Sequence, residues 1–445
     1  MQRGEMKFSA ASLTATAASL RNGDLDLLTY IEDVCTRLND LDSHIRALLP
    51  EKGRRERLLR EVSLLLSRFP EPSERPPLFG IPVGIKDLFR VEGFPTRAGS
   101  KLPSEALAGA EASIVTALRN AGALILGKTT TEEFAYRGEP PPTRNPHNLA
   151  HTPGGSSSGS AAAVAAGLCP LALGTQTLRS TIGPAAYCGA VGFKLSHGRV
   201  PLDGLILMSE SIDSLGLFTQ NAESMDLAAA CVINGWRGGR PDRLPVLAIP
   251  EGQFMEYLSP EARDDFARQC GLLRKAGYRT VNVEVPWDDH PEDIFQRMID
   301  LLRAEMARYH REWHEKYAVL YGPDTTKAIH LGGAISDERL ASLRADQQEL
   351  RVKLQGKMNE AGVDLWITPS SWGPAPEGFA VTGSSGMTGP WSYAGLPAIS
   401  LPAGTATNGL PLGLQCVASW GDDERLTAWA CEIEMVIIRG ADGQL

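Results

Sequence analysis

The sequence lacks the features that mark several large classes of protein. No run of Lys and Arg is longer than a few residues and the net charge is −9, which argues against a nucleic-acid-binding surface. No stretch approaches the apolar length of a membrane span, and the N-terminus has no uninterrupted apolar core of an export signal. The seven cysteines are odd in number and never spaced as C-x-x-C, which predicts free, buried thiols. We therefore expect a cytoplasmic protein with neither a nucleic-acid nor a membrane partner.

Cofactor and metal motifs are missing too. The chain has no P-loop and no G-x-G-x-x-G that follows a strand. His310 and His314 have an i, i+4 spacing that can bind a metal on a helix, but segment 308–316 is charged throughout, which favours a solvated face. The other histidines have no nucleophile anchored on a strand beside them. We expect neither a metal nor a cofactor.

The composition that remains is that of an ordinary globular protein, with 43% hydrophobic and 22% charged residues in 445. Helical periodicity covers residues 9–70, with Ser9 as a helix cap, and predicts an N-terminal helical cover over 1–70. After it, short apolar runs alternate with helical segments such as 112–121 and 222–233, which predicts one α/β/α domain over 1–445. The runs expected to be strands are 81–85, 123–127, 170–174, 247–250 and 365–369.

The stretch from Pro153 to Pro184 carries the strongest signal. It contains GGSSSGS at 154–160, a run of small apolar residues at 161–167, and a second hydroxyl-rich turn at 174–180. A flexible linker is one interpretation of a Gly/Ser run, but the flanks on both sides are apolar. The run also fits G-x-S-x-G with Ser157 as nucleophile, but that motif needs a preceding strand and two prolines precede it instead. Two hydroxyl-bearing turns joined by a helix and a strand would fold back beside each other.

These motifs resemble those of the amidase signature hydrolases. GGSSSGS at 154–160 and GTQTLRS at 174–180 match the two serine turns of that family, and GIPVGIKD at 80–87 matches its lysine motif. Ser156 and Ser180 are 24 residues apart (180 − 156), as in the family pattern. The resemblance extends over about 77–212 and resumes near 364–415, and it implies a mixed, mostly parallel central sheet covered by helices on both faces. It also makes 77–215 the catalytic signature core.

The resemblance implies a role for each motif residue. Ser180 would be the nucleophile, Ser156, after a cis peptide bond to Gly155, would relay its proton, and Lys86 would be the terminal base. Lysine can act as a base only when burial lowers its pKa, and the apolar strand before Lys86 makes burial plausible. The competing interpretation is a surface lysine at a strand end, paired with Asp87 or another acidic residue. The backbone N–H groups carried over as the oxyanion hole are those of Thr177, Leu178, Arg179 and Ser180.

The chain departs from its relatives beside the nucleophile. Leu178 and Arg179 replace the usual Gly-Gly, and Gly183 replaces the arginine that binds a substrate carboxylate in malonamidase-like members. We therefore expect a substrate that lacks a carboxylate near the scissile carbonyl, unless Arg179 reaches in to replace that arginine. For each aromatic among the candidates, core packing is an equal alternative to ligand contact. The candidate substrate-binding residues are Phe134, Tyr136, Gly154, Gly155, Gln176, Gly183 and Trp391.

The predicted function is hydrolysis of a linear carboxamide through a Ser180 acyl-enzyme, with a small-molecule amide as partner and a homodimer left open. Two alternatives remain. One is the glutaminase-type A subunit of a tRNA-dependent amidotransferase, which works in a complex. The other is a non-catalytic binding protein on the same fold, which the departures at 178–179 and 183 allow.

Overall fold

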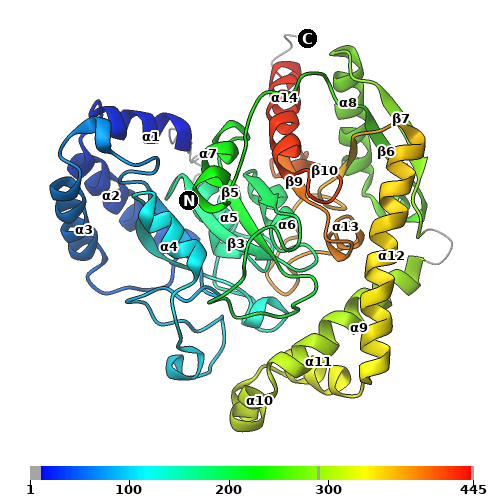
Figure 1. Ribbon diagram of the computed structural model, residues 1–445, viewed down its shortest axis with the longest axis horizontal. Helices are drawn as coiled ribbons and strands as arrows, with labels where there is room; N and C mark the ends of the chain where they lie inside the picture. Colours follow the sequence, from blue (N-terminus) through cyan, green and yellow to red (C-terminus); the bar gives the residue numbers. More distant parts are fainter. Residues whose placement is uncertain (1–11, 288–290, 442–445) are drawn as a thin grey trace.

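A ten-stranded sheet runs through the part of the chain that the computed structural model describes, residues 12–287 and 291–441 (Figure 1). Its order is β2-β1-β3-β5-β4-β9-β10-β8-β6-β7. All five runs predicted as strands are strands. The bounds are β1 (Pro82–Lys86), β2 (Leu124–Thr129), β3 (Leu171–Gln176), β4 (Val191–Lys194), β5 (Ser214–Thr219), β6 (Leu247–Glu251), β7 (Thr280–Glu284), β8 (Leu365–Pro369), β9 (Ala398–Thr405) and β10 (Pro411–Val417).

The sheet is mixed, as the resemblance implies. The pairs at its two ends are parallel, with β1 between β2 and β3 at one end and β6 between β8 and β7 at the other. The five central pairs, from β3 to β8, are antiparallel. Parallel pairs are therefore not the majority among the described strands, because β4, β5, β9 and β10 join the two parallel ends through antiparallel pairing.

Helices cover both faces of this sheet. Gly192 and Phe193 are neighbours on β4 and so point to opposite faces. A methyl group on Gly192 would lie 2.5 Å from the Cβ of Ala185 in α6. On the other face, the Phe193 ring packs on the ring of Trp236, just after α7, with centroids 6.4 Å apart. The helices in the described residues are α1 (Leu13–Asn22), α2 (Leu27–Ile45), α3 (Arg54–Arg68), α4 (Ser113–Asn120), α5 (Ser158–Ala165), α6 (Ile182–Cys188), α7 (Glu223–Val232), α8 (Pro260–Lys275), α9 (Pro291–Tyr309), α10 (Arg311–Tyr317), α11 (Pro323–Gly333), α12 (Asp337–Ala361), α13 (Gly389–Tyr393) and α14 (Asp423–Ala441).

The N-terminal helices pack on later parts of the chain, and a helical cover over 1–70 stays a prediction. α1 packs on α7 and α3 packs on the edge strand β2, on the blue side of Figure 1. Ser12 caps α1 by accepting a hydrogen bond from the N–H of Ala15, and Gly23 ends it in the left-handed conformation. The predicted cap, Ser9, lies outside the described residues. The single-domain organisation stays a prediction, which one sheet shared by both halves of the chain supports.

Helices α9 to α12 form a layer that extends beyond the sheet (Figure 1). His310, the residue before α10, was expected on a solvated face. Its side chain is fully buried instead, so that expectation is wrong for this residue. Its two ring nitrogens contact the Tyr321 hydroxyl and the carbonyl oxygen of Leu207, both at 3.1 Å. No helix in residues 12–287 or 291–441 is both long and apolar enough to cross a membrane.

The cysteines are free, as predicted. Five of the seven are buried, and Cys231 and Cys431 are partly buried.

Candidate active site

Lys86 is the last residue of β1, a strand that is buried along its whole length. The Nζ atom lies 2.7 Å from Ser156 Oγ, 2.9 Å from Ser157 Oγ and 2.8 Å from Thr175 Oγ1. The apolar strand carries the lysine into the interior, and the parallel neighbour β3 brings Thr175 to the same end of the sheet. The predicted lysine motif and both serine turns therefore meet at one amine.

Burial lowers the pKa of Lys86 to about 7, against the opposing effect of the Glu132 and Asp213 carboxyl groups. The alternative in which Lys86 pairs with Asp87 is wrong. Asp87 instead forms a buried ion pair with Lys128 at 2.7 Å. No ion pair to Lys86 exists among the described residues, so its charge has no direct partner and the neutral amine is favoured.

The turn that carries Ser156 is a packed element and not a linker. The peptide bond between Gly155 and Ser156 is cis, as the resemblance implies. Every residue of 154–160 is buried, and a methyl group on Gly159 would lie 2.2 Å from the carbonyl oxygen of Ala47. Glycine is therefore required where α5 meets the N-terminal segment. Close packing on all sides aims the Ser156 hydroxyl at the lysine.

Ser180 lies on the second turn, at the wall of a pocket of about 150 Å³. The N–H of Ser157 donates to the carbonyl oxygen of Ser180 at 3.3 Å, which holds the two turns together. Within the described chain, no hydrogen bond joins the hydroxyl groups of Ser156 and Ser180. Catalytic hydrogen bonds are often long without substrate and shorten when it binds. The backbone thus holds the two serine turns side by side.

The turn from Thr177 to Ser180 presents backbone donors to the pocket that all four of its residues line. None of the hydrogen bonds within the described residues uses the N–H groups of 178–180 as donors. The Thr177 hydroxyl fixes the turn from behind by donating to Asp213 at 2.5 Å. Free N–H groups at a rigid turn can stabilise an oxyanion that develops on a bound carbonyl.

The structure brings only some of the candidate substrate-binding residues to this pocket. Tyr136 and Gly155 line it. Gly154 lies behind the wall, where a methyl group would come 3.0 Å from Pro184 Cα. Gly183 faces the Arg179 guanidinium, whose Nη2 would be 2.4 Å from an added methyl group. The space that a side chain at 183 would need is therefore filled by Arg179.

Gln176, Phe134 and Trp391 do not line the pocket. The Gln176 side chain is fully buried and accepts hydrogen bonds from the N–H groups of Thr181 and Ile182, at 2.8 and 2.9 Å. It holds the beginning of α6 and so supports the turn from behind.

The two aromatic rings belong to the core. Phe134 stacks on Tyr321 with ring centroids 5.0 Å apart. Trp391 packs on Trp366 at 5.3 Å and donates from its ring nitrogen to the carbonyl oxygen of Met387 at 3.0 Å. Both rings therefore pack in the core, which is the alternative that the sequence analysis left open for them.

Sequence reasoning missed several residues at the site. Ser157 and Thr175 contact the lysine, although they lie inside the two motifs that were found. Glu132 lines the pocket as a buried carboxyl whose pKa is raised by burial. Its position close to Phe134 and Tyr136, two of the candidate substrate-binding residues, was the available signal. Arg303 of α9 also lines the pocket, and no local pattern in the sequence indicates this.

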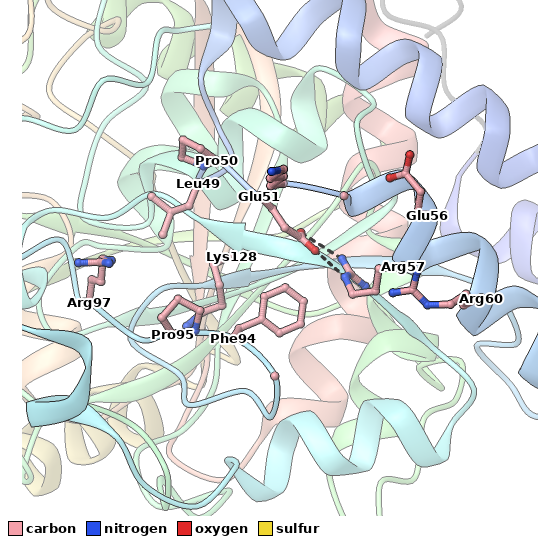
Figure 2. Close-up of a pocket in the computed structure, with 13 residues that line it drawn as sticks. Leu49, Pro50, Glu51, Glu56, Arg57, Arg60, Phe94, Pro95, Arg97 and Lys128 are labelled. Carbon is pink, nitrogen blue, oxygen red and sulfur yellow. Dashed lines mark hydrogen bonds and ion pairs between the residues drawn. The ribbon is translucent and has the colours of Figure 1, made fainter.

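A larger cavity, of about 540 Å³, is lined by residues 49–53 and 93–95 among others and contains neither serine turn (Figure 2). Its central charges are already paired. Arg57 donates to Glu51 at 2.6 Å, and Lys128 is bound to Asp87. Neither Lys86 nor a residue of the two serine turns lines it, so the smaller pocket beside Ser180 is the candidate active site.

Known proteins are similar to this chain in fold and in sequence. A family model described as Amidase matches residues 31–427. The glutamyl-tRNA(Gln) amidotransferase A subunit of Prochlorococcus marinus (strain MIT 9211) is 31% identical, over 92% of this chain and 93% of its own. The crystal structure of an amidase gives a TM-score of 0.86 at 29% identity, covering 96% of this chain and 100% of that one. Peptide amidase from Stenotrophomonas maltophilia has the same fold, with a TM-score of 0.80 at 24% identity, covering 97% and 98% of the two chains. Because the family model spans most of the sequence, the chain belongs to the amidase family, the amidase signature hydrolases.

Proposed function

We propose that the protein hydrolyses the C–N bond of a linear carboxamide, with Ser180 as nucleophile, Ser156 as proton relay and Lys86 as base. The observation that carries this proposal is the buried Lys86 amine, which has no ion-pair partner among the described residues and lies 2.7 Å from Ser156 Oγ. The other two fully or nearly buried lysines of the described chain, Lys128 and Lys194, bind a carboxylate and a carbonyl oxygen, whereas Lys86 contacts only hydroxyl groups.

The hydrogen bonds around Lys86 favour the relay. A neutral amine has two N–H donors and one lone pair. The Ser157 hydroxyl donates to the carbonyl oxygen of Thr175 at 3.1 Å, so towards Lys86 it acts as an acceptor. The lone pair is then left for the hydroxyl of Ser156 or Thr175. Ser156, which follows a residue of the pocket wall, is the one able to pass on a proton from Ser180.

The proposed reaction has two halves. Ser180 Oγ attacks the carbonyl carbon while its proton moves through Ser156 to the Lys86 amine, and the N–H groups of 177–180 stabilise the oxyanion. The intermediate collapses when the C–N bond breaks and the leaving nitrogen takes the proton back. Water then attacks the Ser180 ester by the same proton route, which releases the acid and restores the free serine.

A panel of linear carboxamides tests this function directly. We expect ammonia or amine release from at least one member, and covalent modification of Ser180 by a fluorophosphonate probe, located by mass spectrometry. Heat-denatured protein is the control for non-specific labelling. Folded protein that neither turns over an amide nor labels at Ser180 would contradict the proposal and favour the non-catalytic alternative.

The lowered pKa of Lys86 predicts a pH profile. The amine accepts a proton only when neutral, and its protonated form accumulates as the pH falls below about 7. For a neutral amide, kcat/KM should therefore fall about tenfold per pH unit below this value and level off above it. Burial also lowers the pKa of Lys194 to about 7, so Lys194→Met is the matched control. This variant should show the same fall in kcat/KM below pH 7 as the unmodified protein. A flat profile between pH 5 and 8 would exclude Lys86 as the base.

A second function is favoured by one comparison. The relative from Prochlorococcus marinus is named as the A subunit of a glutamyl-tRNA(Gln) amidotransferase and matches along almost its whole length. On this alternative the chain would release ammonia from glutamine inside a complex. Glutaminase activity that requires a co-purifying protein would favour it over the stand-alone hydrolase.

A further inference from the structure

We infer that the pocket beside Ser180 binds an anionic group, and that the substrate is a small carboxamide whose carboxylate is held by the guanidinium of Arg179. The inference rests on the proposed function for the reaction itself and adds the chemical class of the substrate. Its binding test is independent of turnover.

The Arg179 side chain is folded into the site and only 7% exposed. Its Nη1 donates to the carbonyl oxygen of Thr382 and lies 3.5 Å from that of Gly155, the residue before Ser156. Neither Nη2 nor Nε has an acceptor among the described residues, and Nη2 is buried. One edge of a buried guanidinium is thus left without a partner next to the proposed nucleophile.

Two glycines make room for this side chain. A methyl group on Gly183 would lie 2.4 Å from Arg179 Nη2, and one on Gly383 would lie 2.5 Å from it. The Arg179 guanidinium therefore occupies the space that a side chain at 183 would need. This meets the condition under which a carboxylated substrate was to be expected.

The charges that line the pocket favour an anion. Arg137, Arg179 and Arg303 contribute three cations and Glu132 contributes one carboxyl group. No ion pair joins any of these arginines to a carboxylate within residues 12–287 and 291–441, and Arg303 Nε is also buried without an acceptor. An unpaired guanidinium in a partly buried site is costly unless a ligand completes it. A carboxylate accepts two hydrogen bonds from one guanidinium edge, so it fits this need.

Two cations that line the cavity of Figure 2 have carboxylate partners: Arg57 is bound by Glu51 and Glu61, and Lys128 by Asp87. Arg308, on the same helix as Arg303, pairs with Asp337 at 2.6 Å. Arg57, Lys128 and Arg308 thus have the carboxylate partner that Arg179 lacks.

A binding experiment on the Ser180→Ala variant, which cannot turn over, tests the inference without catalysis. The ligands are glutaramate and pentanamide, which differ only by a carboxylate in place of a methyl group, titrated by ligand-observed NMR. We expect glutaramate to bind at least about tenfold more tightly, the effect of one charge-assisted hydrogen-bonded contact. Adding Arg179→Gln should remove the preference, Arg179→Lys should restore part of it, and Arg308→Gln should leave it unchanged.

Kinetics on the active protein provide the second measurement. The ratio of kcat/KM for glutaramate to that for pentanamide should be about 10 to 100 and fall towards 1 in Arg179→Gln, mainly through KM. If Arg179 had a purely structural role, its substitution would instead lower kcat/KM for glutaramate and for pentanamide by the same factor.

Equal binding of the two ligands to the Ser180→Ala protein overturns the inference, whether or not the arginine variants fold. A preference that survives Arg179→Gln overturns the assignment to this residue. Absence of turnover with the binding preference intact would count against the proposed reaction and leave the anion subsite supported.

Discussion

Replacing Lys86 by methionine is expected to lower kcat/KM for amide hydrolysis by about four orders of magnitude. Methionine has nearly the same length but no lone pair that can accept the Ser180 proton, and removing one member of such a relay costs about as much as removing all of it. The measurement is steady-state hydrolysis of the best amide from the panel, with folding checked by circular dichroism and thermal unfolding.

Lys194→Met is the matched control for this change. Lys194 is also fully buried and also has a pKa lowered to about 7, but its amine donates to the carbonyl oxygen of Leu396 at 2.5 Å, and it does not line the Ser180 pocket. Loss of stability from removing a buried amine should affect both variants, whereas loss of turnover should be confined to Lys86→Met. A folded Lys86→Met protein with more than about a tenth of wild-type activity would rule out this lysine as the base.

Ser180→Ala is expected to abolish both labelling by the fluorophosphonate and detectable turnover, a loss of about 10⁴-fold or more. The substitution removes the atom that forms the acyl-enzyme. Stability should change little, because the Ser180 hydroxyl makes no hydrogen bond to another described residue. Intact-protein mass spectrometry of the labelled protein is the direct measurement.

Ser160→Ala controls for loss of a buried hydroxyl from the same structural unit. The Ser160 hydroxyl donates to the carbonyl oxygen of Leu173 at 2.7 Å and contacts the Thr129 hydroxyl, and it is not among the three hydroxyl groups that contact Lys86. We expect a cost in stability of about 1–3 kcal/mol with labelling of Ser180 retained. If Ser180→Ala still formed a covalent adduct, another nucleophile would have to be assigned.

Five of the ten described strands and the centre of the candidate site could be predicted from local sequence. A buried strand such as Pro82–Lys86 consists mostly of consecutive apolar residues, so it can be recognised from its own sequence without knowledge of its neighbours in the fold. The first serine turn consists of glycine and serine, which have almost no side chain. Packing of the backbone therefore leaves few possible positions for the Ser156 hydroxyl.

Side chains that reach across the fold could not be predicted in the same way. Gln176 lies in a motif yet is used to hold α6, and Trp391 belongs to the core, because each finds its place through contacts that only the folded chain provides. The antiparallel centre of the sheet was likewise not evident, since pairing between strands is non-local.

The sequence by itself determined the family, three strands of the signature core and the three residues proposed for catalysis. Only the tertiary structure decided the partners of the long charged side chains. Asp87 pairs with Lys128 and not with its neighbour Lys86, and Arg179 is anchored by Thr382, 203 residues further along the chain. The physical reason is reach: small residues take their conformation from the local backbone, whereas a lysine or arginine can contact any group that the fold brings within its length.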